Sequence, residues 1–135
     1  MRSPSEWRLL AGASIAQIVT ACALRMLTLP ALRTLFARLR PLLGLVLAGS
    51  EERVIWAIEA TGRRLGGVST CLVRALIVEQ CFSAPDRPLR LMIGVRRATG
   101  SLQSHAWVLD RHRVLIGGST AEEYMPLVTW ESMPA

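Results

Sequence analysis

The fold is decided by the stretch GVSTCLVRALIVEQCF at residues 67–82, followed by LRLMIGV at 89–95 and QSHAWVL at 103–109. The first segment has the composition and apolar pattern of a helix, and Ser69 or Thr70 is suited to cap a helix that begins at the cysteine. The two later segments are short and bounded by turn-forming residues, so they predict strands. A helix followed by antiparallel strands predicts an α+β unit.

Two connections set the limits of these strands. Residues 97–101, RATGS, predict a turn, and residues 110–113 predict a tight connection. Residues 114–116, VLI, then form a third expected strand. We therefore expect three antiparallel strands packed against the cysteine-bearing helix.

The sequence before residue 67 predicts a helical scaffold. Ser50 is a natural N-cap, and Gly66-Gly67 ends the helix that follows it. Pro30 ends the first helix or begins the next one, and Pro41 is expected to break the chain again because an interior proline removes a backbone hydrogen bond. The three expected helices cover residues 6–29, 31–40 and 51–65.

The composition limits the function classes. The chain has 135 residues, of which 51% are hydrophobic and 19% charged, so it forms one domain with a real core and is not disordered. All 16 basic residues are arginine and the net charge is +6, but no run of arginines is longer than two. Without a basic stripe or interleaved aromatic residues, nucleic acid is not an expected partner. The charge favours a solvated, generally basic surface, and a site for an acidic peptide or protein also fits it.

Cysteine usage predicts a reduced, cytoplasmic setting. The chain has three cysteines, an odd number, with no evident secretory signal and no CxxC or His/Cys spacing for a metal. We expect no metal and no cofactor. The apolar run from Leu9 to Leu24 is short for a membrane span and contains Gln17, so a docking or buried helix is favoured, with membrane association as the alternative.

Cys71 is the cysteine with a reactive position. The first turn of a helix has unpaired amide groups and a positive dipole end, which favour a thiolate over a thiol. The structural alternative is a small buried hydrophobic residue, as expected for Cys22 and Cys81. His105, on a strand that packs against the same helix, is the imidazole that a cysteine nucleophile needs, whereas His112 lies in a connection.

A resemblance adds to this interpretation. The blocks TCLVRALIVEQC (70–81), LRLMIGVRR (89–97) and SHAWVLDRHRVLIGGS (104–119) resemble the transglutaminase-like cysteine peptidases of lasso-peptide biosynthesis. The resemblance covers residues 67–127. It implies a papain- or transglutaminase-like core at residues 67–135, after a helical part at 1–66, within a single domain.

The resemblance also implies roles for particular residues and partners. Cys71 is then the nucleophile and His105 the general base and acid of a leader peptidase that cleaves a ribosomally made precursor. The helical half resembles the split form of the enzyme, in which the leader-binding domain is a separate protein. The implied partners are the precursor's leader peptide, that leader-binding protein and the ATP-dependent lasso cyclase.

The third, orienting member of the site stays open. Some relatives carry an aspartate twelve residues after the histidine, where this chain has Gly117. Asp110 is a weak candidate because it lies five residues from His105 along one strand, about 16 Å away and on the opposite face. Glu122 is another, with Glu123, and a backbone carbonyl or water would also serve.

Two further functions compete with the peptidase. A non-catalytic helical adaptor would bind a partner protein or a membrane surface and use its histidine and cysteines only for structure. Acyl transfer to an amine, as in true transglutaminases, would use the same nucleophile with a different acceptor.

Overall fold

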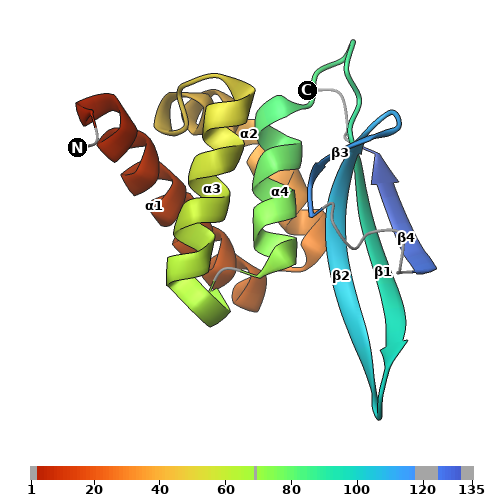
Figure 1. Ribbon diagram of the computed structural model, residues 1–135. Helices are drawn as coiled ribbons and strands as arrows, with labels where there is room; N and C mark the ends of the chain where they lie inside the picture. Colours follow the sequence, from red (N-terminus) through yellow and green to blue (C-terminus); the bar gives the residue numbers. More distant parts are fainter. Residues whose placement is uncertain (1–2, 69, 118–124, 132–135) are drawn as a thin grey trace.

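The computed structural model describes residues 3–68, 70–117 and 125–131, which form helices and one antiparallel sheet (Figure 1). The helices are α1 (Pro4–Met26), α2 (Leu29–Val46), α3 (Glu51–Leu65), the short 3-10 turn η1 (Gly66–Val68) and α4 (Cys71–Phe82). The strands are β1 (Arg90–Ala98), β2 (Ser101–Asp110), β3 (Arg113–Ile116) and β4 (Met125–Glu131), in the spatial order β3-β2-β1-β4. The expected α+β fold class is confirmed.

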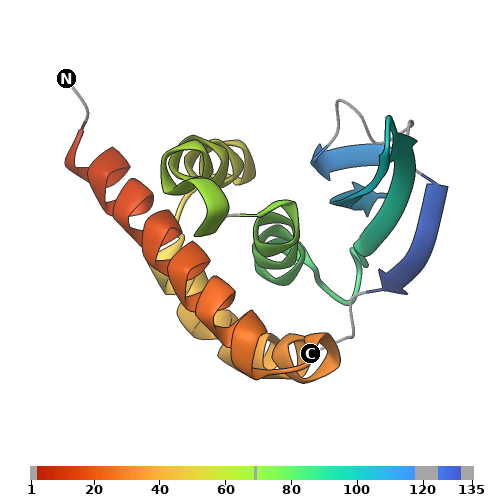
Figure 2. The ribbon, with the colours of Figure 1, turned by 90° about the horizontal axis from the view of Figure 1, so that it is seen from below.

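The elements form layers with α4 in the middle. Seen from below, α1 and α2 lie on one side of α4 and the sheet on the other (Figure 2). Helix α4 packs against β2 of the sheet and against α1, α2 and α3. The cysteine-bearing helix is therefore enclosed on both sides, which fixes its N-terminus relative to β2.

Each helix begins at a hydroxyl cap, as the sequence predicts for α3 and α4. The cap side chain accepts a hydrogen bond from the backbone amide three residues later, which satisfies one of the unpaired amides of the first turn. The caps are Ser3, Thr28, Ser50 and Thr70. Thr70, rather than Ser69, caps the helix that begins at Cys71.

The expected break at Pro41 is wrong. Helix α2 continues through Pro41 to Val46. The proline is exposed, while Leu43 on the far side of it is buried in the same core as Leu32 and Phe36. Burial of a leucine is worth about 2 kcal/mol, which offsets much of the cost of the interior proline.

Strand β4 is an element that the sequence does not predict. This strand pairs with β1 through a register that includes Leu91 opposite Trp130, with an irregularity at Ile93/Gly94. Pro126 argues against a strand at this position, because proline cannot donate a hydrogen bond to the ladder. However, β4 is an edge strand, where proline is tolerated. The β1–β2 hairpin is longer than expected, since Ala98 pairs with Ser101 and the turn shrinks to residues 99–100.

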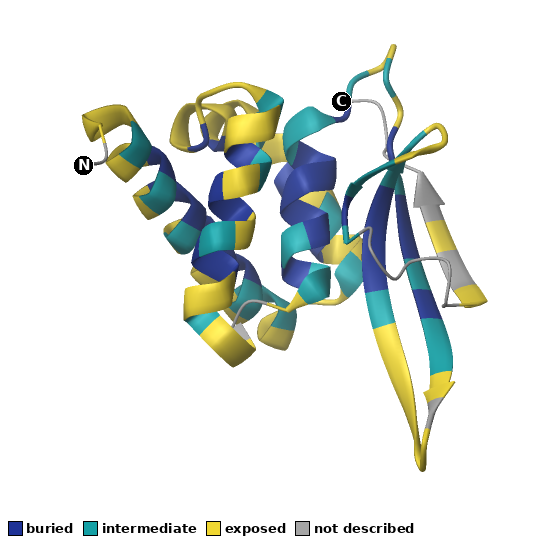
Figure 3. Cartoon of the chain, viewed as in Figure 1, coloured by how far each residue is buried: buried dark blue, intermediate teal, exposed yellow. Residues whose placement is uncertain are grey.

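One apolar core joins the helices to the inner face of the sheet (Figure 3). Buried polar side chains also link the layers. Glu79 of α4 is fully buried and receives two hydrogen bonds from Arg33 of α2, from Nε at 3.2 Å and Nη2 at 2.7 Å. Gln17 of α1 donates to the Ile58 carbonyl at 3.2 Å and to Thr61 Oγ1 at 2.7 Å, both on α3. These bonds hold α1 and α2 in place behind α4.

Candidate active site

The cysteine candidate lies at the first residue of α4. Thr70 precedes it, and the Thr70 hydroxyl accepts a hydrogen bond from the amide of Val73 at 3.3 Å. Cys71 is half-buried, with one side packed against the apolar core. The predicted position at the start of a helix is therefore the one that the structure shows.

The histidine candidate lies on β2, the strand against which α4 packs. Its Nε2 atom is 2.8 Å from the carbonyl oxygen of Gly117, just beyond β3. A carbonyl oxygen only accepts hydrogen bonds, so Nε2 carries the ring proton in this contact. The ring also stacks against Trp107, with centroids 5.9 Å apart and planes at 22°. The hydrogen bond to Gly117 and the stacking on Trp107 both restrict the orientation of the His105 ring.

The backbone at Gly117 requires glycine. Its φ is +83°, and a Cβ there would lie 2.8 Å from the Ala106 carbonyl oxygen and 3.2 Å from His105 Nε2. A side chain at this position would therefore displace either the strand or the imidazole. The position at which some relatives carry an aspartate instead supplies a backbone oxygen to the same histidine.

Cys71 and His105 line the same cavity, which has a volume of about 270 Å³. Charged residues that were not predicted from the sequence line the cavity with them. The remaining lining residues are Glu59 and Arg63 of α3, Arg74 of α4, Ala106, Ile116 and Gly117. Arg74 follows Cys71 by three residues and so shares its helix face, a signal that could have been read from the sequence. Glu59 and Arg63 reach the cavity because α3 packs beside α4, which the local sequence pattern does not indicate.

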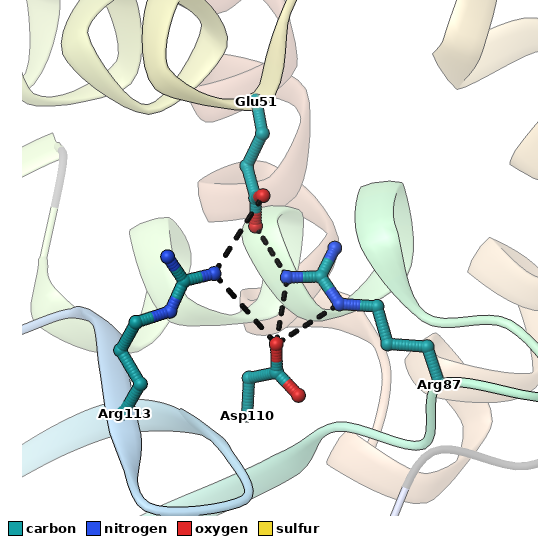
Figure 4. Close-up of polar contacts among 4 residues, drawn as sticks. All are labelled: Glu51, Arg87, Asp110 and Arg113. Carbon is teal, nitrogen blue, oxygen red and sulfur yellow. Dashed lines mark hydrogen bonds and ion pairs between the residues drawn. The ribbon is translucent and has the colours of Figure 1, made fainter.

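Asp110 lies in a different cluster, shown in Figure 4. Its Oδ2 atom accepts hydrogen bonds from Arg87 Nε at 3.0 Å and Nη2 at 2.8 Å, and lies 3.7 Å from Arg113. Arg87 also binds Glu51 at the start of α3, at 2.7 Å, and this hydrogen bond raises the pKa of the guanidinium. Asp110 is not among the residues that line the cavity with Cys71. It joins the β2–β3 connection to α3.

The other acidic candidates are not among the described residues that line the cavity with Cys71 and His105. Glu122 and Glu123 lie outside the described residues. Asp86 is exposed in the segment between α4 and β1. Within the described ranges 3–68, 70–117 and 125–131, no three His, Cys, Asp or Glu side chains are arranged to hold a metal ion.

The other two cysteines have contrasting environments. Burial raises the pKa of the Cys81 thiol to about 12, against the opposing effect of Arg40, so this thiol stays protonated at neutral pH. Cys22 is exposed on α1, and its assignment as a packing residue is wrong. Gln17 and Thr20 lie on the buried face of α1, and Cys22 lies outside that face.

Comparison with known proteins identifies the family. A family model described as the transglutaminase-like superfamily matches residues 14–129. The chain belongs to the transglutaminase-like superfamily. The match begins within α1, so the superfamily domain includes most of the helical half, which the resemblance read from the sequence did not cover. No curated protein and no solved structure matches the chain.

Membership of this superfamily supports cysteine chemistry at a coarse level. The superfamily includes cysteine peptidases and transferases. Both activities begin with attack of a thiolate on an acyl carbon and differ in the acceptor that releases the acyl group. The transglutaminase-like core therefore suggests a cysteine-dependent activity of the peptidase type.

Proposed function

We propose that this chain is a cysteine peptidase in which Cys71 is the nucleophile and His105 the general base and acid. The observation that carries the proposal is that both residues line one cavity while the histidine ring is held by the Gly117 carbonyl. A helix N-terminus suits the thiolate, and an oriented imidazole suits proton transfer. The superfamily of the chain supports the same chemistry.

The proposed reaction passes through a thioester with Cys71. His105 takes the thiol proton, and Cys71 Sγ attacks the carbonyl carbon of the scissile peptide bond. The C–N bond breaks as the imidazolium returns the proton to the leaving amine. Water then attacks the thioester, His105 removes its proton, and the free acid and the thiol are released. Throughout the cycle, the Gly117 carbonyl keeps the ring from rotating.

The start of α4 offers donors for the oxyanion. Thr70 accepts the amides of Val73 and Arg74 through its hydroxyl and carbonyl oxygens. The amides of Cys71 and Leu72 are then the first-turn donors for the negative oxygen that forms on the attacked carbonyl.

The substrate that we propose is the leader of a lasso precursor peptide. This step rests on the resemblance of the TCLVR, IGVRR and HAWV segments, and on the positive charges of Arg63 and Arg74 at the cavity, which suit an acidic peptide. A separate leader-binding protein would present the precursor, and the ATP-dependent cyclase would take the released core. The cytoplasm is the compartment for such a pathway.

The test is reconstitution of the full chain with the precursor and the leader-binding protein encoded beside it, followed by mass spectrometry of the products. A peptidase yields two peptides whose summed mass exceeds that of the precursor by one water. A product with a new amide would show acyl transfer to an amine instead. An unchanged precursor in the complete mixture would favour the helical adaptor.

A further inference from the structure

Helices α1 and α2 both present exposed apolar side chains. On α1 these residues lie on the side opposite its buried residues. We call these residues of α1 and α2 the apolar face: Trp7, Ile15, Ile18, Val19, Met26, Leu35, Leu39, Leu42, Leu45 and Val46. Ile15 and Val19 are each 58% exposed, so both are accessible on this face.

The apolar face is shared by two helices that pack closely against each other. A Cβ at Gly12 of α1 would lie 2.4 Å from the Val46 carbonyl oxygen of α2, so the two backbones are in direct contact there. This layer lies on the other side of α4 from the sheet (Figure 2). The face therefore points away from β2 and His105.

The charges on α1 and α2 are positive except for Glu6, in the first turn of α1. Residues 7–50 contain no aspartate or glutamate. Arg8 and Arg25 are exposed on the outer side of α1, near its two ends and about 26 Å apart along the helix. Arg38 is exposed on α2. An apolar patch bordered by arginines is complementary to a surface that has an apolar interior and a negatively charged outer layer.

Helix α1 is also long and apolar enough to cross a membrane, but its contacts hold it on the protein. It is the only such helix in the part of the chain described, with mean hydropathy 1.6 and 33% of that window buried. Gln17 is fully buried and donates to Ile58 and Thr61 of α3. Insertion across a bilayer would break these bonds in an apolar medium, whereas contact along the outer side keeps them.

We propose that the apolar face docks on the surface of an anionic lipid bilayer, with α1 and α2 lying in the interface. Apolar side chains enter the acyl boundary while Arg8, Arg25 and Arg38 reach the negative headgroups. A second copy of the chain fits less well, because the two helices carry five arginines against a single acidic residue, Glu6, so that a self-contact would set arginines mainly against arginines. Docking in this way leaves the cavity of Cys71 on the side away from the lipid.

The test is sedimentation of the full chain with vesicles of phosphatidylcholine alone or mixed with phosphatidylglycerol. We expect binding to the mixed vesicles, weakened by salt, and little binding to phosphatidylcholine. The variant Ile15→Gln/Val19→Gln is expected to lose this binding. Leu102→Gln is the matched control, because Leu102 is 69% exposed on the distant β1–β2 hairpin.

A second pair of variants separates charge from apolar contact. Arg8→Gln/Arg25→Gln should bind the mixed vesicles about twenty-five-fold more weakly, at about five-fold for each arginine. Arg97→Gln/Arg111→Gln removes the same charge from exposed positions outside these helices and should have a smaller effect. Unfolding curves of each variant verify that the fold is intact.

Cys22 gives a measurement that needs no variant. It is exposed on α1 between Val19 and Met26, so vesicles that cover the face should slow its reaction with a maleimide. Failure of the native chain to sediment with mixed vesicles would overturn the proposal, as would equal binding of Ile15→Gln/Val19→Gln and Leu102→Gln. A stable dimer broken by the Ile15/Val19 variant would assign the face to a second copy and overturn it as well.

Discussion

Nε2 of His105 donates a hydrogen bond to the carbonyl oxygen of Gly117, 2.8 Å away. This bond assigns the ring proton to Nε2 and restricts rotation of the imidazole. The backbone thereby performs the task for which other cysteine–histidine sites use a carboxylate or amide side chain. A neutral carbonyl orients the ring, although it stabilises the imidazolium less than a carboxylate would.

Gly117→Ala is expected to impair the proposed reaction more than the fold. The substitution places a Cβ 3.2 Å from His105 Nε2 and 2.8 Å from the Ala106 carbonyl oxygen. A residue with a side chain at this positive φ costs about 1–2 kcal/mol, and the crowding moves the histidine. We predict a fall in kcat for precursor cleavage of at least about tenfold with little change in KM.

Gly100→Ala is the matched control for that variant. Gly100 has a similar φ of +77°, but no atom lies within 4 Å of its Cβ position. It should lose about the same stability as any alanine at positive φ and keep its activity. Equal losses of kcat in the two variants would show that the Gly117 carbonyl has no special part in the reaction.

Asp110→Asn is expected to leave activity in place and weaken the fold. Asp110 pairs with Arg87 and Arg113 in the cluster of Figure 4, and its side chain is partly exposed. The expected loss is about 1 kcal/mol of unfolding free energy, measured by urea denaturation. A drop in kcat without a drop in stability would instead make Asp110 the orienting residue.

Glu79→Gln is expected to destabilise the whole chain. It removes the charge of a fully buried side chain that binds Arg33 at 2.7 Å, and it leaves the guanidinium without its counter-charge. Breaking a buried pair in this way costs about 3 kcal/mol. The double variant Arg33→Met/Glu79→Leu should recover much of that loss in the urea midpoint. If the double variant is no more stable than Glu79→Gln, the loss does not come from the uncompensated charge.

The pKa of Cys81 makes a prediction for alkaline solutions. Its thiol titrates at about 12 in the folded chain, against an ordinary value of 9.0. Between these values the unfolded chain releases the proton and the folded chain keeps it, so the free energy of unfolding falls as pH rises. Below the lower value both states are protonated and there is no effect.

Cys81→Ala should remove this fall in the free energy of unfolding between pH 9.0 and about 12, as measured by thermal melts across that pH range. In the native chain, iodoacetamide should modify Cys81 at least about tenfold more slowly than the exposed Cys22 near neutral pH. Rapid modification of Cys81 would contradict the burial described for it.

The local signals in the sequence were sufficient for α1, α3, α4 and the first three strands, and for placing Cys71 at the start of a helix and His105 on a strand. A hydroxyl before Cys71 and the short apolar run after His105, bounded by turn residues, act within a few residues, so they could be read directly. The exposure of Cys22, the edge position of Pro126 and the approach of Glu59 to the cavity depend on tertiary packing. The Gly117 carbonyl belongs to the same group, because a backbone oxygen has no signature in a sequence.

Cleavage of the precursor by Cys71→Ala, compared with Cys81→Ala, tests the central claim most directly. Both variants replace one partly buried thiol with the same small residue, so differences in packing are minimised. With the leader-binding protein present and the fold verified by thermal melts, we predict that Cys71→Ala gives no cleaved peptide while Cys81→Ala cleaves at close to the native rate. Cleavage by Cys71→Ala at the native rate would contradict the account.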